Sequence, residues 1–123
     1  MPNAVVIVIV EDDISVRESL PDLLEEFGYA AETFASAEEF LASDAVSDAS
    51  CLVLDIGLPG MSGSDLHREL IARGFSIPTI FITARADYSI PPDLLKAGGI
   101  ACLIKPVGER ELRAALDLAL QEN

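Results

Sequence analysis

Leu52-Val53-Leu54-Asp55, followed closely by Gly57 and Pro59, is the stretch that decides the fold of this chain. A short, unbroken run of branched apolar residues next to turn residues is typical of a strand buried on both faces in a parallel sheet. The strand cannot continue through the glycine and proline residues, so Asp55 is predicted to end it. In open α/β sheets, ligands bind at the carboxyl ends of the strands. The Asp55 carboxylate is therefore expected to face a functional crevice.

The composition favours a single globular domain over residues 1–123. Half of the 123 residues are hydrophobic, which suits an α/β domain with its own core. The apolar runs are shorter than the roughly 20 residues of a membrane span, and the N-terminus does not resemble a signal peptide. The net charge of −13 disfavours direct binding to nucleic acid or to an anionic membrane. Cys51 and Cys102 lie in apolar runs, which predicts reduced thiols in a cytoplasmic protein.

Strands and helices are expected to alternate along the chain. Apolar runs predict the other strands at 4–10, 29–34, 77–82 and 100–104. Apolar positions at helical spacing predict helices at 14–27, 36–42, 63–73, 93–97 and 109–120. This order predicts an α/β, flavodoxin-like (βα)5 three-layer sandwich with a parallel sheet in the order 2-1-3-4-5.

Three local features qualify this prediction. Pro21 lies inside the first predicted helix and indicates a kink or a late helix start, because proline lacks an N–H group. Residues 43–50 are polar and are predicted to form a loop. His67, the only histidine, is expected on the exposed side of its helix, and a single histidine makes a poor metal site.

Side chains of different chemistry are predicted at four strand ends. They are Glu11, Asp12, Asp13, Asp55, Thr83 and Lys105. Clustered acids repel one another unless a cation lies among them, and such oxygen ligands suit Mg²⁺ completed by phosphate oxygens. A carboxylate can accept a phosphoryl group, which a lysine and a hydroxyl would stabilise. Taken alone, the first three acids also fit a solvated turn at a helix N-terminus.

The chain resembles the CheY-like receiver domain of bacterial two-component response regulators over essentially its whole length. It is most similar to the receivers of LuxR-type, FixJ-like regulators. The matching segments are 9–13, 54–63, 82–84 and 105–106.

The resemblance implies phosphorelay signalling and not an enzyme in the ordinary sense. A receiver catalyses only its own phosphorylation and dephosphorylation. Its phosphoryl donor would be the phosphohistidine of a sensor histidine kinase or of a histidine phosphotransfer protein. The resemblance leaves open whether the output is an effector domain, a separate protein or a homodimer.

The resemblance also assigns roles to individual residues. Asp55 corresponds to the phosphoacceptor, Thr83 to the switch hydroxyl and Lys105 to the lysine of the site. Mg²⁺ would be bound by Asp12, by Asp55 and by the backbone carbonyl of Gly57, with Glu11 reaching the metal through water. Pro106 follows the lysine, at a peptide bond that is cis in many members.

Several positions depart from the family pattern. Gly57 places no side chain beside the acceptor, whereas Arg85 borders the site and is expected to attract small phosphodonors. Cys102 stands where many receivers have a Phe or Tyr that rotates inward, a movement that a cysteine cannot make. Pro91 and Pro92 shorten the fourth helix, which is part of the usual output face.

Two other functions fit part of the pattern. Phosphatases of the haloacid dehalogenase type use a strand-end Asp, a Thr and a Lys with Mg²⁺, but they need an acid where this chain has Gly57. A receiver-like module that binds partners without switching would explain Cys102. It would not explain the intact acidic pair together with Thr83 and Lys105.

Overall fold

Within residues 5–121, which the computed structural model describes, a parallel sheet of five strands has the order β2-β1-β3-β4-β5. The strands are β1 (Val6–Val10), β2 (Ala30–Phe34), β3 (Cys51–Asp55), β4 (Thr79–Thr83) and β5 (Gly99–Ile104). The helices are α1 (Ile14–Glu26), α2 (Ala37–Leu41), α3 (Ala45–Asp48), α4 (Gly63–Ala72), α5 (Pro92–Lys96) and α6 (Glu109–Ala119). The predicted flavodoxin-like topology is confirmed. None of the described helices has the length and hydrophobicity needed to cross a membrane.

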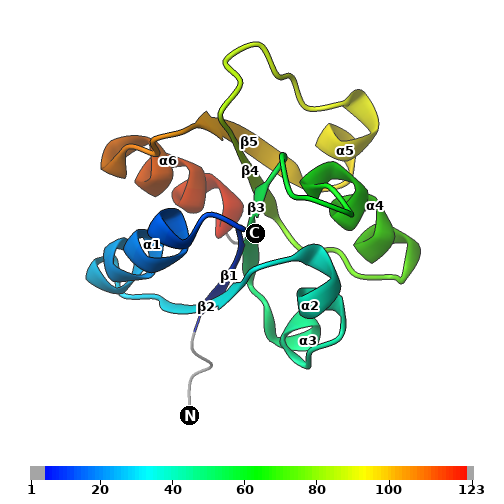
Figure 1. Cartoon of the computed structure of the whole chain (residues 1–123), viewed down its shortest axis with the longest axis horizontal. Coiled ribbons are helices and arrows are strands. Elements are labelled where there is room, and N and C mark those ends of the chain that lie inside the picture. The colour runs from blue at the N-terminus through cyan, green and yellow to red at the C-terminus, as the bar shows by residue number, and fades with distance from the viewer. Residues whose placement is uncertain (1–4, 122–123) are drawn as a thin grey trace.

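Helices cover both faces of the sheet and produce two hydrophobic cores. Figure 1 shows α1 and α6 on one face and α2, α3, α4 and α5 on the other. Successive side chains of a strand point to opposite faces, so Ile7 and Ile9 pack with α1 and α6. Val8 and Val10 pack on the side of α2, α4 and α5. Because β1 supplies both cores, its sequence is apolar at every position.

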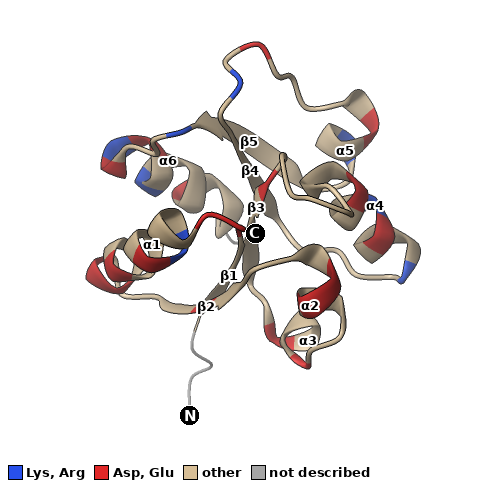
Figure 2. Cartoon of the chain, viewed as in Figure 1, with Lys and Arg blue, Asp and Glu red and all other residues tan. Residues whose placement is uncertain are grey.

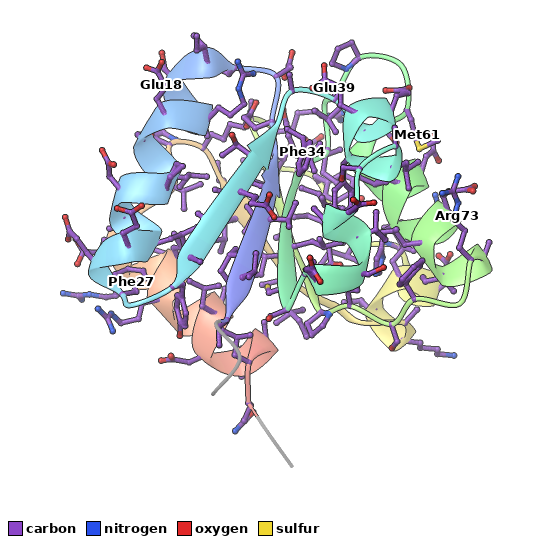
Figure 3. All side chains as sticks on the ribbon, turned by 90° about the horizontal axis from the view of Figure 1, so that it is seen from below. Glu18, Phe27, Phe34, Glu39, Met61 and Arg73 are labelled. Atoms are coloured by element: carbon purple, nitrogen blue, oxygen red, sulfur yellow. The ribbon has the colours of Figure 1, made fainter. Side chains whose placement is uncertain are left out.

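Charged side chains lie outside these cores. Figure 3 shows Glu18 and Arg73 on the outer surface of the molecule, with Phe34 turned toward α2. The ring of Phe34 lies 5.4 Å from that of Phe40, between centroids. This contact packs the end of β2 against α2.

Short polar side chains define where the helices begin. Asp13 caps α1 by accepting the Ser15 N–H at 2.8 Å. Ser36 caps α2 by accepting the Glu39 N–H at 3.1 Å. Ser62 caps α4 in the same way. These caps satisfy backbone donors that lack a partner within the helix.

One local prediction is wrong, and one alternative for the first helix is excluded. Residues 43–50 do not form a loop throughout, because α3 lies inside them. Ala45 and Val46 of α3 are buried, and their burial stabilises a turn that is too short for a periodicity signal. Of the two alternatives for Pro21, the late start is excluded, since α1 runs from Ile14 to Glu26 through Pro21, and the kink stays a prediction. Residue 4 of the first predicted strand lies outside the described residues.

The prediction that His67 is exposed is also wrong, since it is only 2% exposed. Its ring packs edge-on against Phe81 of β4, with 5.5 Å between centroids. A side chain at Gly98 would approach the Nε2 atom of His67 at 4.0 Å. Within the described residues, neither ring nitrogen has a hydrogen-bond partner. Burial lowers the pKa of His67, and the nearby Arg68 lowers it further.

We expect the substitution His67→Leu to stabilise the fold by about 1 kcal/mol, because it removes unpaired buried nitrogens. The effect should grow as the pH falls below the ordinary histidine value of 6.5. In that range the unfolded chain takes up a proton that the folded chain does not, so the wild type loses stability. Urea unfolding of both proteins at about pH 5.5 and about pH 8 measures the difference. A difference that does not change with pH would contradict this account.

Candidate functional site

The sheet brings the predicted site residues to one edge. In its register the ends of β1 and β3 lie side by side, as do the ends of β4 and β5. Figure 2 shows the acidic ends of β1 and β3 close together at the centre of the view. The residues at or just after these four strand ends are Glu11, Asp55, Thr83 and Lys105.

Lys105 connects the acidic residues of two strands. Its Nζ atom lies 2.9 Å from Glu11 Oε1 and 3.1 Å from Asp55 Oδ2. Glu11 is fully buried, whereas the Lys105 side chain is 20% exposed. The other oxygen of Asp55, Oδ1, accepts the N–H of Gly57 at 3.0 Å. Both oxygens of Asp55 are thus held by positively polarised groups.

A cavity of about 540 Å³ opens above Asp55. Asp12, Gly57, Thr83 and Lys105 are among the residues that line it. Thr83 is buried, and its Oγ1 atom accepts the backbone N–H two residues further along the chain, at 3.0 Å. Because the hydroxyl oxygen acts as acceptor in this bond, the hydroxyl proton remains able to donate into the cavity.

Two residues near the acceptor have other contacts. Arg85 lines the cavity, but its guanidinium pairs with Asp87 at 3.2 Å and its side chain is 72% exposed. Asp13 also lines the cavity, while its carboxylate caps α1. The acidic turn is therefore both a helix N-terminus and part of the candidate site, and the two interpretations of its sequence are compatible.

The acidic residues fit a divalent cation. One carboxylate oxygen from each of Glu11, Asp12 and Asp55 can be chosen so that all three lie within 4.8 Å of one another. Oε1 of Glu11 is buried and lies in ion-pair contact with Lys105 without hydrogen-bond geometry, so it retains capacity as an acceptor. Asp12 is exposed, which leaves room for water ligands. Oxygen donors with retained water are the environment that Mg²⁺ prefers.

The charges of this cluster influence one another. Burial raises the pKa of Glu11 to about 7, and the neighbouring Asp55 adds to the rise, whereas the Asp13 N–H and Lys105 oppose it. Burial alone would lower the pKa of Lys105, but its close contacts with the carboxylates of Glu11 and Asp55 raise it. Lys105 therefore remains a cation at neutral pH, and a bound metal ion would favour the ionised form of Glu11.

The sequence interpretation missed one contact of the acidic turn. Nη1 of Arg17 donates to the backbone carbonyls of Glu11 and Asp12, at 3.1 and 3.2 Å. The sequence feature that could have indicated this contact is the position of Arg17, a basic residue about one turn into the helix that follows the acids. Such a residue is common on helix surfaces, so its position alone does not predict the contact.

The two cysteines are free thiols, as predicted. Cys51 is buried in β3, whereas Cys102 is half-buried in β5. Cys102 lies beside a cavity of about 380 Å³ that Ile104 and Pro106 also line. The peptide bond between Lys105 and Pro106 is cis.

The sequence profile of the response regulator receiver domain matches residues 7–117. The chain belongs to this family. The receiver domain is therefore a signalling domain of the two-component type, and its α/β topology is that of the family.

Known proteins support this assignment. The receiver domain is 42% identical to response regulator protein TodT of Pseudomonas putida over 124 residues, covering 98% of this chain and 55% of TodT. It matches the structure of the response regulator StyR with 42% identity and a TM-score of 0.88, covering 96% of this chain and 60% of that one. The FixJ-N crystal structure matches with 33% identity and a TM-score of 0.83, covering 100% and 98%. The receiver domain spans about half the length of the curated relatives it matches.

We expect Glu11→Gln to remove a pH-dependent cost of folding. The carboxyl of Glu11 stays protonated in the folded chain up to about pH 7, whereas in the unfolded chain it ionises near 4.5. The wild type should therefore lose stability relative to the variant as the pH rises through this window. Urea unfolding of both proteins across this range, in a chelator that removes divalent ions, measures the change. If the free energy of unfolding changes with pH by the same amount in both proteins, Glu11 is not buried as a neutral acid.

Proposed function

We propose that the receiver domain accepts a phosphoryl group on Asp55 from a phosphohistidine of a sensor histidine kinase or a histidine phosphotransfer protein. The observation that carries the proposal is the double contact of Lys105 with Asp55 and Glu11 at an edge that also presents Asp12 and Thr83. An oxygen of Asp55 forms the bond to phosphorus while the phosphorus–nitrogen bond of the donor breaks. The departing imidazole keeps the electron pair of that bond and takes up a proton.

The acidic residues would hold Mg²⁺ in this proposal. Asp12, Asp55 and the backbone carbonyl of Gly57 are the proposed ligands, and Glu11 would reach the ion through water. When bound, the ion neutralises part of the negative charge on the phosphoryl oxygens. A Cβ atom at Gly57 would lie 3.7 Å from Oδ1 of Asp55, which is van der Waals contact. Because glycine has no such atom, the approach to the carboxylate stays open.

Lys105 and Thr83 act on the transferred group. The ammonium of Lys105 lies 3.1 Å from Oδ2 of Asp55 before transfer, and a phosphoryl oxygen would become its new partner. Such a fixed positive charge stabilises the charge that develops during transfer. The Thr83 hydroxyl would donate a hydrogen bond to a phosphoryl oxygen, and this bond forms only when Asp55 is modified.

The chemistry is confined to the domain's own modification in this proposal. The receiver domain catalyses only its own phosphorylation and the hydrolysis that removes the phosphoryl group. A phosphatase of the haloacid dehalogenase type requires an acid two residues after the nucleophile, and Gly57 offers none there. In this proposal the domain therefore hydrolyses the phosphoryl group on its own Asp55 and does not act on a separate phosphate ester.

The wider setting is also part of the proposal. We infer that residues 1–123 form one receiver domain in the cytoplasm, in accord with its free thiols. Its partners are the phosphodonor protein and an output partner, which is an effector domain, a separate protein or a second copy. The net charge of −13 favours protein partners over direct contact with nucleic acid or membrane.

We expect acetyl phosphate with Mg²⁺ to add one phosphoryl group, about 80 Da, to the intact domain. Intact-mass spectrometry measures the adduct. The matched control Asp55→Asn should give no adduct, because the amide cannot act as the acceptor. Chelation of the metal should also abolish it. An adduct that persists in the control would place the phosphoryl group elsewhere and reject the proposal.

We expect beryllofluoride, a phosphoryl mimic, to change amide exchange across residues 88–103, which include α5 and most of β5. A switch alters this region when Asp55 is modified, even though Cys102 cannot perform a ring rotation. Hydrogen–deuterium exchange with and without the mimic measures the change. Bound mimic with unchanged exchange would instead identify a module that binds partners without switching.

A further inference from the structure

Arg17 of α1 folds back onto the turn that carries the acids. Its Nη1 atom donates to the carbonyl oxygens of Glu11 and Asp12 at 3.1 and 3.2 Å, and its side chain is half-buried. The surrounding turn is acidic, yet across residues 5–121 this guanidinium forms no ion pair with a carboxylate. Its hydrogen bonds instead join the backbone of the turn to the helix.

The turn needs such a support because Glu11 and Asp12 are held differently. The Glu11 carboxylate is fixed by the Asp13 N–H at 3.0 Å and by Lys105 at 2.9 Å. The Asp12 side chain is exposed, and among the described residues it has no hydrogen-bond partner of its own. The direction of its carboxylate therefore depends on the backbone of the turn, which Arg17 holds at both carbonyls.

We propose that Arg17 is a positioning residue for the metal site. It holds the backbone of Glu11 and Asp12 so that the Asp12 carboxylate stays within reach of the Asp55 oxygens. The inference rests on the proposed function, because it concerns the proposed Mg²⁺ site. Groups that orient metal ligands from outside the coordination shell typically change metal affinity by about 10- to 100-fold when removed.

The charge of Arg17 has the opposite effect on a cation. A guanidinium near the site repels Mg²⁺, so its removal would tighten binding if charge were its only role. Loss of positioning would weaken binding. The sign of the change in Mg²⁺ affinity therefore separates the two roles.

The test is isothermal titration of the full chain with Mg²⁺ alone. The variant Arg17→Met keeps the apolar stem but removes the donors, and Arg17→Lys keeps both a charge and donors. Arg110→Ala is the control for charge, because Arg110 is an exposed residue of α6. Thermal unfolding without Mg²⁺ checks the fold of each protein. Arg17→Gln, whose amide is too short to reach both carbonyls, repeats the comparison if the Met variant does not fold.

We expect Arg17→Met to weaken Mg²⁺ binding about tenfold and Arg17→Lys to restore affinity to within about twofold of wild type. At saturating Mg²⁺ the rate of phosphorylation by acetyl phosphate should return to the wild-type value, because Arg17 acts only through the turn. Equal or tighter Mg²⁺ binding by the Met variant overturns the inference. So does an equal loss in Arg110→Ala, because a weaker affinity in both variants would not be specific to the contacts of Arg17 with the turn. If the wild type itself fails to bind Mg²⁺ or to gain a phosphoryl group, the proposed function fails instead.

Discussion

The contact of Lys105 with Glu11 and Asp55 is the interaction on which the candidate site depends. It joins the ends of β1, β3 and β5, which are far apart in the sequence. Two ionised acids cannot lie this close in a buried position unless a positive charge compensates them or one of them takes up a proton. The ammonium supplies that charge before any metal or phosphoryl group arrives, so the site can exist in the unmodified chain.

The parallel sheet makes this contact available. All strand pairs in the described sheet are parallel, so the carboxyl ends of β1, β3, β4 and β5 lie along one edge. In the central strands β1, β3 and β4 the middle positions are apolar, and the polar residues lie at or just beyond the strand ends. This pattern therefore buries the cores and gathers the chemically active groups at one edge.

Local geometry around the acceptor combines rigidity with access. A Cβ atom at Gly63 would clash with the backbone oxygen of Asp55, so the glycine lets the start of α4 pack against the acceptor strand. Gly57 instead leaves open space beside the carboxylate and donates its N–H to Oδ1. One glycine thus permits close packing and the other permits entry of a phosphoryl group.

Apart from the short helix α3, the sequence by itself determined the order of strands and helices, the edge at which Asp55 lies and the identity of the acid, hydroxyl and amine groups. These features follow from periodicity and turn residues, which act between near neighbours in the chain. The tertiary structure alone decided that His67 is buried, that Arg17 contacts the acidic turn and that burial raises the pKa of Glu11 to about 7. Each of these depends on which faces pack together and how much water they exclude, and a local pattern of residues carries neither quantity.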